Sequence, residues 1–190
     1  MNLPFIADKT FKNKDYTTKT LAKGEYDNCT FINCNFSESY LSTISFLECE
    51  FIDCNLSLTK TKETAFKDVV FNNCKLLGVP FQDCNPFLFS VRFNNCILSL
   101  ASFYNLKIKF TTFKSCKLEQ TDFTNTDLTA STFDECDLHK AIFDSSIIER
   151  ADFTTSKNIS INPENNRIKG AKFSKANALG LLSHYNIDIL

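Results

Sequence analysis

Nine cysteines and two histidines are the side chains of this 190-residue chain with the most specific chemistry. Thiolates and imidazoles bind metals, and paired thiols form disulfides. Metal and redox sites usually contain close pairs such as C-x-x-C, and this sequence has none. The two histidines, His139 and His184, are far apart in the sequence. Six of the cysteines instead recur at steps of 20 or 22 residues: Cys34, Cys54, Cys74, Cys96, Cys116 and Cys136.

The cysteine spacing follows a repeat that runs through most of the chain. Phenylalanine recurs every 20 residues, with one two-residue slip between Phe71 and Phe93, and apolar residues also recur every five residues. The ladder consists of Phe11, Phe31, Phe51, Phe71, Phe93, Phe113, Phe133, Phe153 and Phe173. Neither a helix, with a period of about 3.6, nor a simple strand, with a period of about 2, produces this pattern. It predicts a solenoid whose units stack on one another.

The repeat also assigns an orientation to the cysteines. We call each apolar residue of the five-residue period an apolar centre. The position two residues before each centre carries a small or β-branched residue. Residues two apart on an extended backbone point to the same face. Cysteine alternates there with Ala, Ser, Thr and Val, which favours buried, reduced thiols that fill the core. A metal site and occasional disulfides between stacked thiols are the alternatives. We expect no cofactor.

Triplets of a small residue, Asp or Asn, and Leu or Phe occur at residues 34–36, 54–56, 121–123, 126–128, 136–138 and 151–153. In these triplets the chain resembles the pentapeptide-repeat proteins from about Ile6 to Phe173. The resemblance implies an all-β fold, a right-handed quadrilateral parallel β-helix, with one pentapeptide per side and 20 residues per coil. Adjacent coils would lie about 4.8 Å apart.

The expected organisation is a β-helix over residues 1–175, followed by a C-terminal module over residues 176–190. The spacing of Ala178, Leu181, Leu182 and Tyr185 predicts a short amphipathic helix in this module. Within the β-helix region, residues 154–166 form an irregular polar loop. Covering the open end of the β-helix is one role of the module, and joining two copies is the other.

The slip at about residues 82–91 is the main break in the repeat. Its two extra residues predict a bulge, with Leu88 or a neighbour continuing the apolar column. Phe87, Phe89 and Phe110 are candidates for a small exposed aromatic patch, although Phe110 and the bulge could instead cover each other. Thr61 stands where an apolar centre is expected, which we interpret as a solvated corner.

The C-terminal residues carry a narrower resemblance. Residues 167–173, 180–182 and 187–189 are similar to the closing segment of quinolone-resistance (Qnr-like) pentapeptide proteins. This resemblance implies an end-to-end homodimer, and binding to DNA gyrase or topoisomerase IV by mimicry of DNA, with protection against quinolones. The long projecting loops of many such relatives have no counterpart here. The implied dimer contacts are Leu181, Leu182, Tyr185, Ile187 and Ile189.

Mimicry of DNA requires acidic groups along one face. Six carboxylates lie between Lys117 and Lys140 with no Lys or Arg among them, and they are the candidate acidic face. These residues are Glu119, Asp122, Asp127, Asp134, Glu135 and Asp137. The alternative is an ordinary solvated surface, because Asp before the apolar centre also serves corner hydrogen bonds.

Charge and motifs exclude several classes of function. A net charge of −1 gives no general attraction for nucleic acid or an anionic membrane. No signal peptide, membrane span, phosphate-binding loop or nucleophile–base motif is found, so we expect a cytoplasmic protein that is not an enzyme. The leading interpretation is a rigid scaffold that binds a protein partner, and topoisomerase binding is the alternative.

Overall fold

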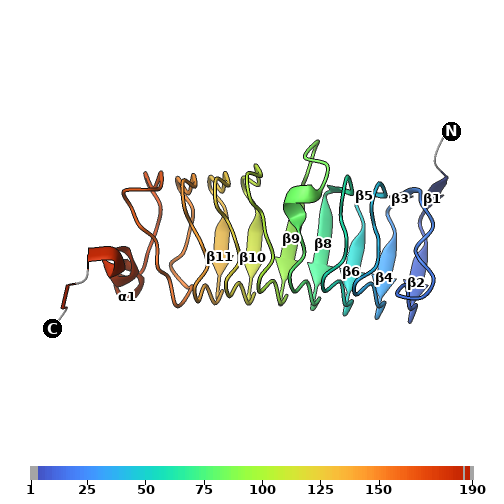
Figure 1. Cartoon of the computed structure of the whole chain (residues 1–190), viewed down its shortest axis with the longest axis horizontal. Coiled ribbons are helices and arrows are strands. Elements are labelled where there is room, and N and C mark those ends of the chain that lie inside the picture. Colours follow the sequence, from blue (N-terminus) through green and yellow to red (C-terminus); the bar gives the residue numbers. More distant parts are fainter. Residues whose placement is uncertain (1–3, 186, 189–190) are drawn as a thin grey trace.

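The computed structural model describes residues 4–185 and 187–188, and it shows an elongated rod in which the chain winds in successive coils (Figure 1). Two parallel sheets run along the rod. One has the order β1-β3-β5-β7, with bounds Phe5–Ala7, Glu25–Asp27, Ser45–Leu47 and Ala65–Lys67. The other has the order β2-β4-β6-β8-β9-β10-β11. Its strands are Thr10–Lys12, Thr30–Ile32, Glu50–Ile52, Val69–Asn72, Val91–Asn94, Thr112–Lys114 and Thr132–Asp134.

The rod has four sides, which we number in chain order. Side 1 carries the seven-stranded sheet, sides 2 and 3 are ladders of single β-bridges, and side 4 begins with the four-stranded sheet. Partners are 20 residues apart, as in Phe31↔Phe51, and 22 apart across the slip, as in Phe71↔Phe93. The structure is therefore the expected parallel β-helix of 20-residue coils.

Each corner is made by a residue in the left-handed backbone conformation. Among residues 4–185 and 187–188, twenty-six residues other than glycine have φ between 48° and 65°, almost all of them two positions after an apolar centre. Each such residue costs roughly 1–2 kcal/mol outside glycine. The cost is offset because its N–H donates to the next coil, as from Asn33 to the Ile52 carbonyl at 2.9 Å and from Leu100 to the Glu119 carbonyl at 3.0 Å. This repeated corner explains how a chain with only four glycines can turn so often.

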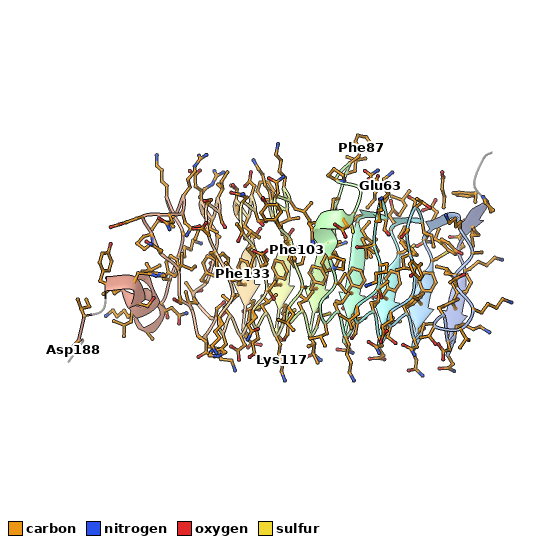
Figure 2. All side chains as sticks on the ribbon, viewed as in Figure 1. Glu63, Phe87, Phe103, Lys117, Phe133 and Asp188 are labelled. Carbon is orange, nitrogen blue, oxygen red and sulfur yellow. The ribbon has the colours of Figure 1, made fainter. Side chains whose placement is uncertain are left out.

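The phenylalanine ladder forms a continuous stack of rings along side 1. Neighbouring rings lie nearly parallel, with centroids 4.8 Å apart for Phe31 and Phe51 and 4.7 Å apart for Phe133 and Phe153. Rings from side 3 meet this stack edge-on, as Phe123 meets Phe113 at 5.9 Å and 82°. Each such pair contributes about 0.5–1.5 kcal/mol beyond the burial of its area. Phe103 and Phe133 lie inside the rod in Figure 2.

The cysteines are part of the same core, as predicted. All nine are free and buried. The thiols other than that of Cys84 donate to carbonyl oxygens of the preceding coil, for example from Cys54 Sγ to Phe31 O and from Cys74 Sγ to Phe51 O, both at 3.3 Å. The interpretation of cysteine as core filler is confirmed.

The slip forms a projecting loop between the short 3-10 helix η1 (Phe81–Asp83) and β9 (Figure 1). Phe89 continues the apolar column of side 4, whereas Leu88 is 64% exposed. The neighbour, rather than Leu88, therefore takes the interior place. The four-stranded sheet ends at β7 because the loop replaces its next strand.

The expectation of a solvated corner at Thr61 is wrong. Thr61 is 2% exposed, and its Oγ1 donates to the Pro80 carbonyl at 2.7 Å. Threonine can therefore occupy the interior position of an apolar centre, because its hydroxyl forms a hydrogen bond to the backbone of the next coil.

The C-terminal end closes the rod with short helical pieces. A four-residue helix α1 (Lys175–Ala178) is capped by Ser174, whose side chain accepts from Asn177 N, and 3-10 helices η2 (Leu179–Leu181) and η3 (Ser183–Tyr185) follow. The single amphipathic helix that the spacing predicted is therefore divided. No helix of the described residues has the length and apolar character needed to cross a membrane.

The segment 154–166 is less polar in its packing than its sequence suggested. Ile159 and Ile161 are buried, and Lys157 still pairs with Asp137 of the preceding coil. Ile161 N donates to the Gly180 carbonyl at 3.3 Å, which fixes the end module against this segment. A Cβ at position 180 would collide with the Ile159 carbonyl, so glycine is required there.

We expect Phe113→Ala to lower the free energy of unfolding by about 3–5 kcal/mol, because it removes a fully buried ring from the stack. Phe110→Ala, three residues earlier, is the matched control because that ring is 72% exposed, and its effect should stay within about 0.5 kcal/mol. Denaturant unfolding followed by circular dichroism measures both. Equal losses in the two variants would contradict the assignment of inward and outward positions.

Candidate functional site

The described residues contain no group of three or more His, Cys, Asp or Glu side chains arranged to hold a metal ion. The thiols are also buried, which limits their access to any substrate. Burial raises the pKa of Cys49 to about 12 and that of Cys84 to about 12. The reactive thiolate form of these two residues is consequently scarce near neutral pH.

The six candidate acidic residues do not share one face. Asp137 is in the ladder of side 2, Asp122 in that of side 3 and Asp127 in that of side 4. Glu119 follows Leu118 at the corner between sides 2 and 3. The remaining two follow the side 1 centre Phe133, at the corner leading to side 2: Asp134 and Glu135. The structure therefore distributes these carboxylates around the rod.

Two of these carboxylates are also paired. Asp127 Oδ2 lies 3.2 Å from Lys109 Nζ, and Asp137 Oδ2 lies 3.7 Å from Lys157 Nζ. Burial of Asp127 opposes its ionisation, but hydrogen bonds from Thr129 and the charge of Lys109 outweigh burial and lower its pKa below the ordinary value. Asp127 Oδ1 accepts from Thr129 Oγ1 at 2.6 Å and from Thr129 N at 3.1 Å. The Asp127 carboxylate therefore stabilises the turn between Asp127 and Thr129.

The aromatic bulge is an exposed surface, with one correction. Phe87 is 68% exposed and lies at the outer end of the projecting loop (Figure 2), and Phe110 is 72% exposed. These two rings therefore do not cover each other, and both are exposed to solvent. Phe89 does not belong to the exposed patch, because its ring packs edge-on against Phe66 and Phe81 with centroids 6.4 and 6.2 Å away.

Two lysines and a cavity adjoin the bulge. Lys67 Nζ lies 5.7 Å from the centroid of the Phe87 ring. A cavity of about 310 Å³ opens beside the loop and is lined by Pro86, Phe89, Asn105, Leu106 and Lys107. We use the term slip patch for the side chains of the projecting loop and of the adjoining coils on its side of the rod: the half-buried Lys67 and the exposed Phe87, Leu88, Lys107 and Phe110.

The candidate dimer contacts lie at the C-terminal end of the rod. Leu181 is half-buried against the core, whereas Leu182, Tyr185 and Ile187 are 38%, 49% and 55% exposed. The Tyr185 hydroxyl donates to Glu164 Oε1 at 2.8 Å. The fifth candidate, Ile189, lies outside the described residues.

Two features were missed at the sequence level. Leu58, Leu77 and Leu100 form a second group of exposed apolar residues at the corner between sides 2 and 3. Leucine at a left-handed corner position was the available signal for Leu58 and Leu100.

The second feature is a cavity of about 610 Å³ near the C-terminal end, which both histidines line. The loss of the five-residue period after Phe153 was the signal for this cavity.

The family model for the pentapeptide repeat region matches residues 25–86 and 87–173, which meet inside the projecting loop. The chain belongs to the pentapeptide-repeat family. Two trypsin-treated variants of QnrB1, a plasmid-mediated fluoroquinolone resistance protein, have the same fold. Each aligns with a TM-score of 0.63 at 16% identity, over 98% or 100% of this pentapeptide-repeat chain and 100% of the other.

HetL, a pentapeptide repeat protein involved in heterocyst differentiation regulation in Nostoc sp. strain PCC 7120, is a more distant match. It has 14% identity and a TM-score of 0.45 over 88% of this chain and 86% of its own. No curated protein matches the sequence.

All nine thiols should resist a disulfide reagent such as DTNB in the native protein, because they are buried and burial raises the pKa of Cys34, Cys49 and Cys84. Absorbance at pH 8 should record no rapid reaction, and all nine should react after denaturation in guanidinium. Rapid modification of any thiol in the folded protein would show that its coil opens or that the thiol is not interior.

Proposed function

We propose that this pentapeptide-repeat protein is a non-enzymatic, rigid scaffold that binds a protein partner through the slip patch. The observation that carries this proposal is the exposure of Phe87 and Leu88 on the loop that projects at the slip, together with the exposure of Phe110 in the following coil. Exposed apolar groups of this kind, rimmed by polar residues, are typical of interaction surfaces.

The slip patch combines two features of a small binding surface, an apolar cavity and charges that are unpaired among the described residues. The cavity beside the loop offers a place for one apolar anchor, since Phe89 and Leu106 line it. Lys67 and Lys107 form no ion pair within the described part of the chain, so their charges are available to a partner. A segment with an aromatic or aliphatic anchor next to acidic residues is the complementary partner.

The rod also supplies the rigidity that such a surface requires. The core side chains stack from coil to coil, and the loop is fixed at both ends by backbone bonds, from Asn85 N to Thr64 O at 2.9 Å and from Ser90 N to Phe66 O at 3.0 Å. A partner would therefore meet a largely preformed surface, which lowers the entropic cost of binding.

Binding to a type II topoisomerase by DNA mimicry has less support from the surface. A mimic of duplex DNA needs a continuous negative face, whereas the six carboxylates lie on different sides and two are paired with lysines. The likeness to QnrB1 at 16% identity concerns the fold. A partner that recognises the slip patch is the proposal that these observations favour.

We further propose that the C-terminal end joins two rods. Leu182, Tyr185 and Ile187 present exposed apolar surface at the end of the solenoid, where a second copy would cover it. Leu181 is instead committed to the cap of its own chain, because it packs on the core.

Random-peptide phage display on the immobilised protein tests the slip patch. We expect enriched peptides to combine an aromatic or branched apolar residue with Asp or Glu. The double substitution Phe87→Ser with Phe110→Ser should weaken their binding at least about tenfold. Leu100→Ser is the control, since Leu100 is 56% exposed on another corner. The proposal is wrong if no such motif is enriched, or if the control weakens binding as much as the patch variant.

Light scattering coupled to size exclusion tests the end-to-end dimer. The native chain should have twice its monomer mass of 21.6 kDa. Leu182→Asp should return it to the monomer mass, because it places a charge in the apolar contact. Leu100→Asp is the control and should keep the dimer mass. A native monomer, or a dimer that survives Leu182→Asp, would remove the C-terminal end as the interface.

A further inference from the structure

A cavity near the end of the rod lies between the last regular coil and the closing module. Its volume is about 610 Å³. Its walls come from residues 139–144, from residues within 158–165, and from η3 through His184. His139 and His184, the two histidines of the sequence, meet at this cavity although they are 45 positions apart.

The cavity exists because the ladder of side 3 stops one coil early. Bridges link Pro80, Ser102, Asp122 and Ile142 in succession, and among the described residues Ile142 has no bridge partner in the next coil. The chain leaves the side there, and the side chain of Asn166 fills only part of the missing strand. Its Nδ2 donates to Phe143 O at 2.9 Å, and its Oδ1 accepts from Ser146 N at 2.9 Å.

Backbone donors remain free at the edge of this cavity. Phe103 N donates to Asp122 O at 2.8 Å and Phe123 N to Ile142 O at 2.9 Å, but Phe143 N, at the same place one coil later, has no backbone acceptor within the described residues. The same holds at the preceding corner. Gln120 N donates to His139 O at 2.9 Å, whereas Lys140 N has no such partner in the described part of the chain. Two N–H groups are thus available to a ligand.

Three side chains that can donate hydrogen bonds from nitrogen, one lysine and two histidines, lie around these backbone donors. Lys140, His139 and His184 line the cavity, and none of them forms an ion pair among the residues that the structure describes. One carboxylate, that of Asp144, also lines it. It accepts from Asn165 Nδ2 at 3.3 Å and from Ser145 Oγ at 3.4 Å, so neighbouring donors hold it.

The cavity also has an apolar part. Phe143 and Ile159 are only 7% and 8% exposed, and Ala141 and Ile142 continue the apolar surface. The volume lies within the range of about 300–1,000 Å³ that is typical of small-molecule sites. A hydrated inorganic ion would leave this surface uncovered.

We propose that this cavity binds a small organic anion, a carboxylate or phosphate carried on an aromatic or branched apolar group. The anion accepts from the N–H groups of Lys140 and Phe143, with Lys140 Nζ supplying positive charge and the rings of His139 and His184 supplying further hydrogen-bond donors. The apolar group covers Phe143 and Ile159.

Occupation of this site would fix the closing module. The module already contacts the cavity wall through Ser160 Oγ and Ser183 Oγ, 2.9 Å apart. Because His184 follows Ser183 directly, a ligand held by Lys140 and His184 bridges the last coil and the cap. We therefore expect ligand binding to raise the temperature at which the C-terminal end unfolds.

Isothermal titration of the full chain with phenyl phosphate, benzoate and inorganic phosphate tests the proposal. We expect saturable binding of at least one organic anion, and binding of inorganic phosphate at least about tenfold weaker. Lys140→Ala and His184→Ala should each weaken organic-anion binding at least about fivefold, while melting like the native chain without ligand. Alanine is tolerated at such a corner, since Ala130 has the same conformation with φ of 56°.

Lys169→Ala is the matched control, because Lys169 is an exposed lysine of the final coil outside this cavity. Its binding should equal that of the native chain. Three results would overturn the proposal: no saturation by either organic anion up to about 10 mM, equal affinity for inorganic phosphate, or the same loss in the control as in the cavity variants.

Discussion

The parallel 20-residue register is the constraint on which the rest of the structure depends. It places Phe31 on Phe51 and, across the slip, Phe71 on Phe93, so each interior position receives the same kind of side chain in every coil. A coil that loses this register loses its hydrogen bonds and its ring contacts together. The left-handed corners follow from the same constraint, because only a sharp turn after each centre returns the chain to the next side within five residues. Residues such as Glu48 and Leu100 accept an unfavourable φ because the ladder bonds of the coil compensate for it.

This constraint explains why residues with reactive side chains have structural roles here. A cysteine two positions before a centre must point inward, where Cys54 Sγ meets the carbonyl of Phe31 and burial raises the pKa of Cys49. An aspartate one position before a centre lies in a ladder of β-bridges between coils. Its side chain can accept hydrogen bonds from the following turn, as Asp127 Oδ1 accepts from Thr129 Oγ1. Both residue types are therefore explained by their position in the pentapeptide. Chemistry that requires convergent side chains is difficult to build on such a surface, since neighbouring sides face different directions.

The sequence was sufficient for the periodic part of the fold and insufficient where the period fails. The ladder predicted the columns and the inward cysteines, because period alone fixes which residues share a side. The errors have local causes. Thr61 is buried because its hydroxyl reaches Pro80 O, a contact between coils that composition does not reveal. Phe89 rather than Leu88 enters the core, since the geometry of the loop decides which of three consecutive apolar residues turns inward. The acidic run seemed to be one face because its residues are close in sequence, but a chain that turns every five residues distributes a run of 19 over all four sides.

The two candidate binding places share one physical cause. At the slip, a loop replaces a strand of side 4, and at the C-terminal end the chain leaves side 3 before its ladder is complete. In each case the regular neighbour that would cover an apolar surface is missing, and a cavity opens beside an apolar centre: Phe89 at the slip and Phe143 at the end. The two places differ in what they leave free. The slip exposes whole aromatic side chains with its backbone bonds largely kept, which suits a protein surface. The end leaves backbone N–H groups without acceptors among the described residues, beside Lys140 and the two histidines, in a cavity of about 610 Å³, which suits an anion. The kind of ligand that an interrupted coil can bind therefore depends on what the interruption exposes. Exposed side chains favour a protein partner, and exposed backbone N–H groups favour an anion.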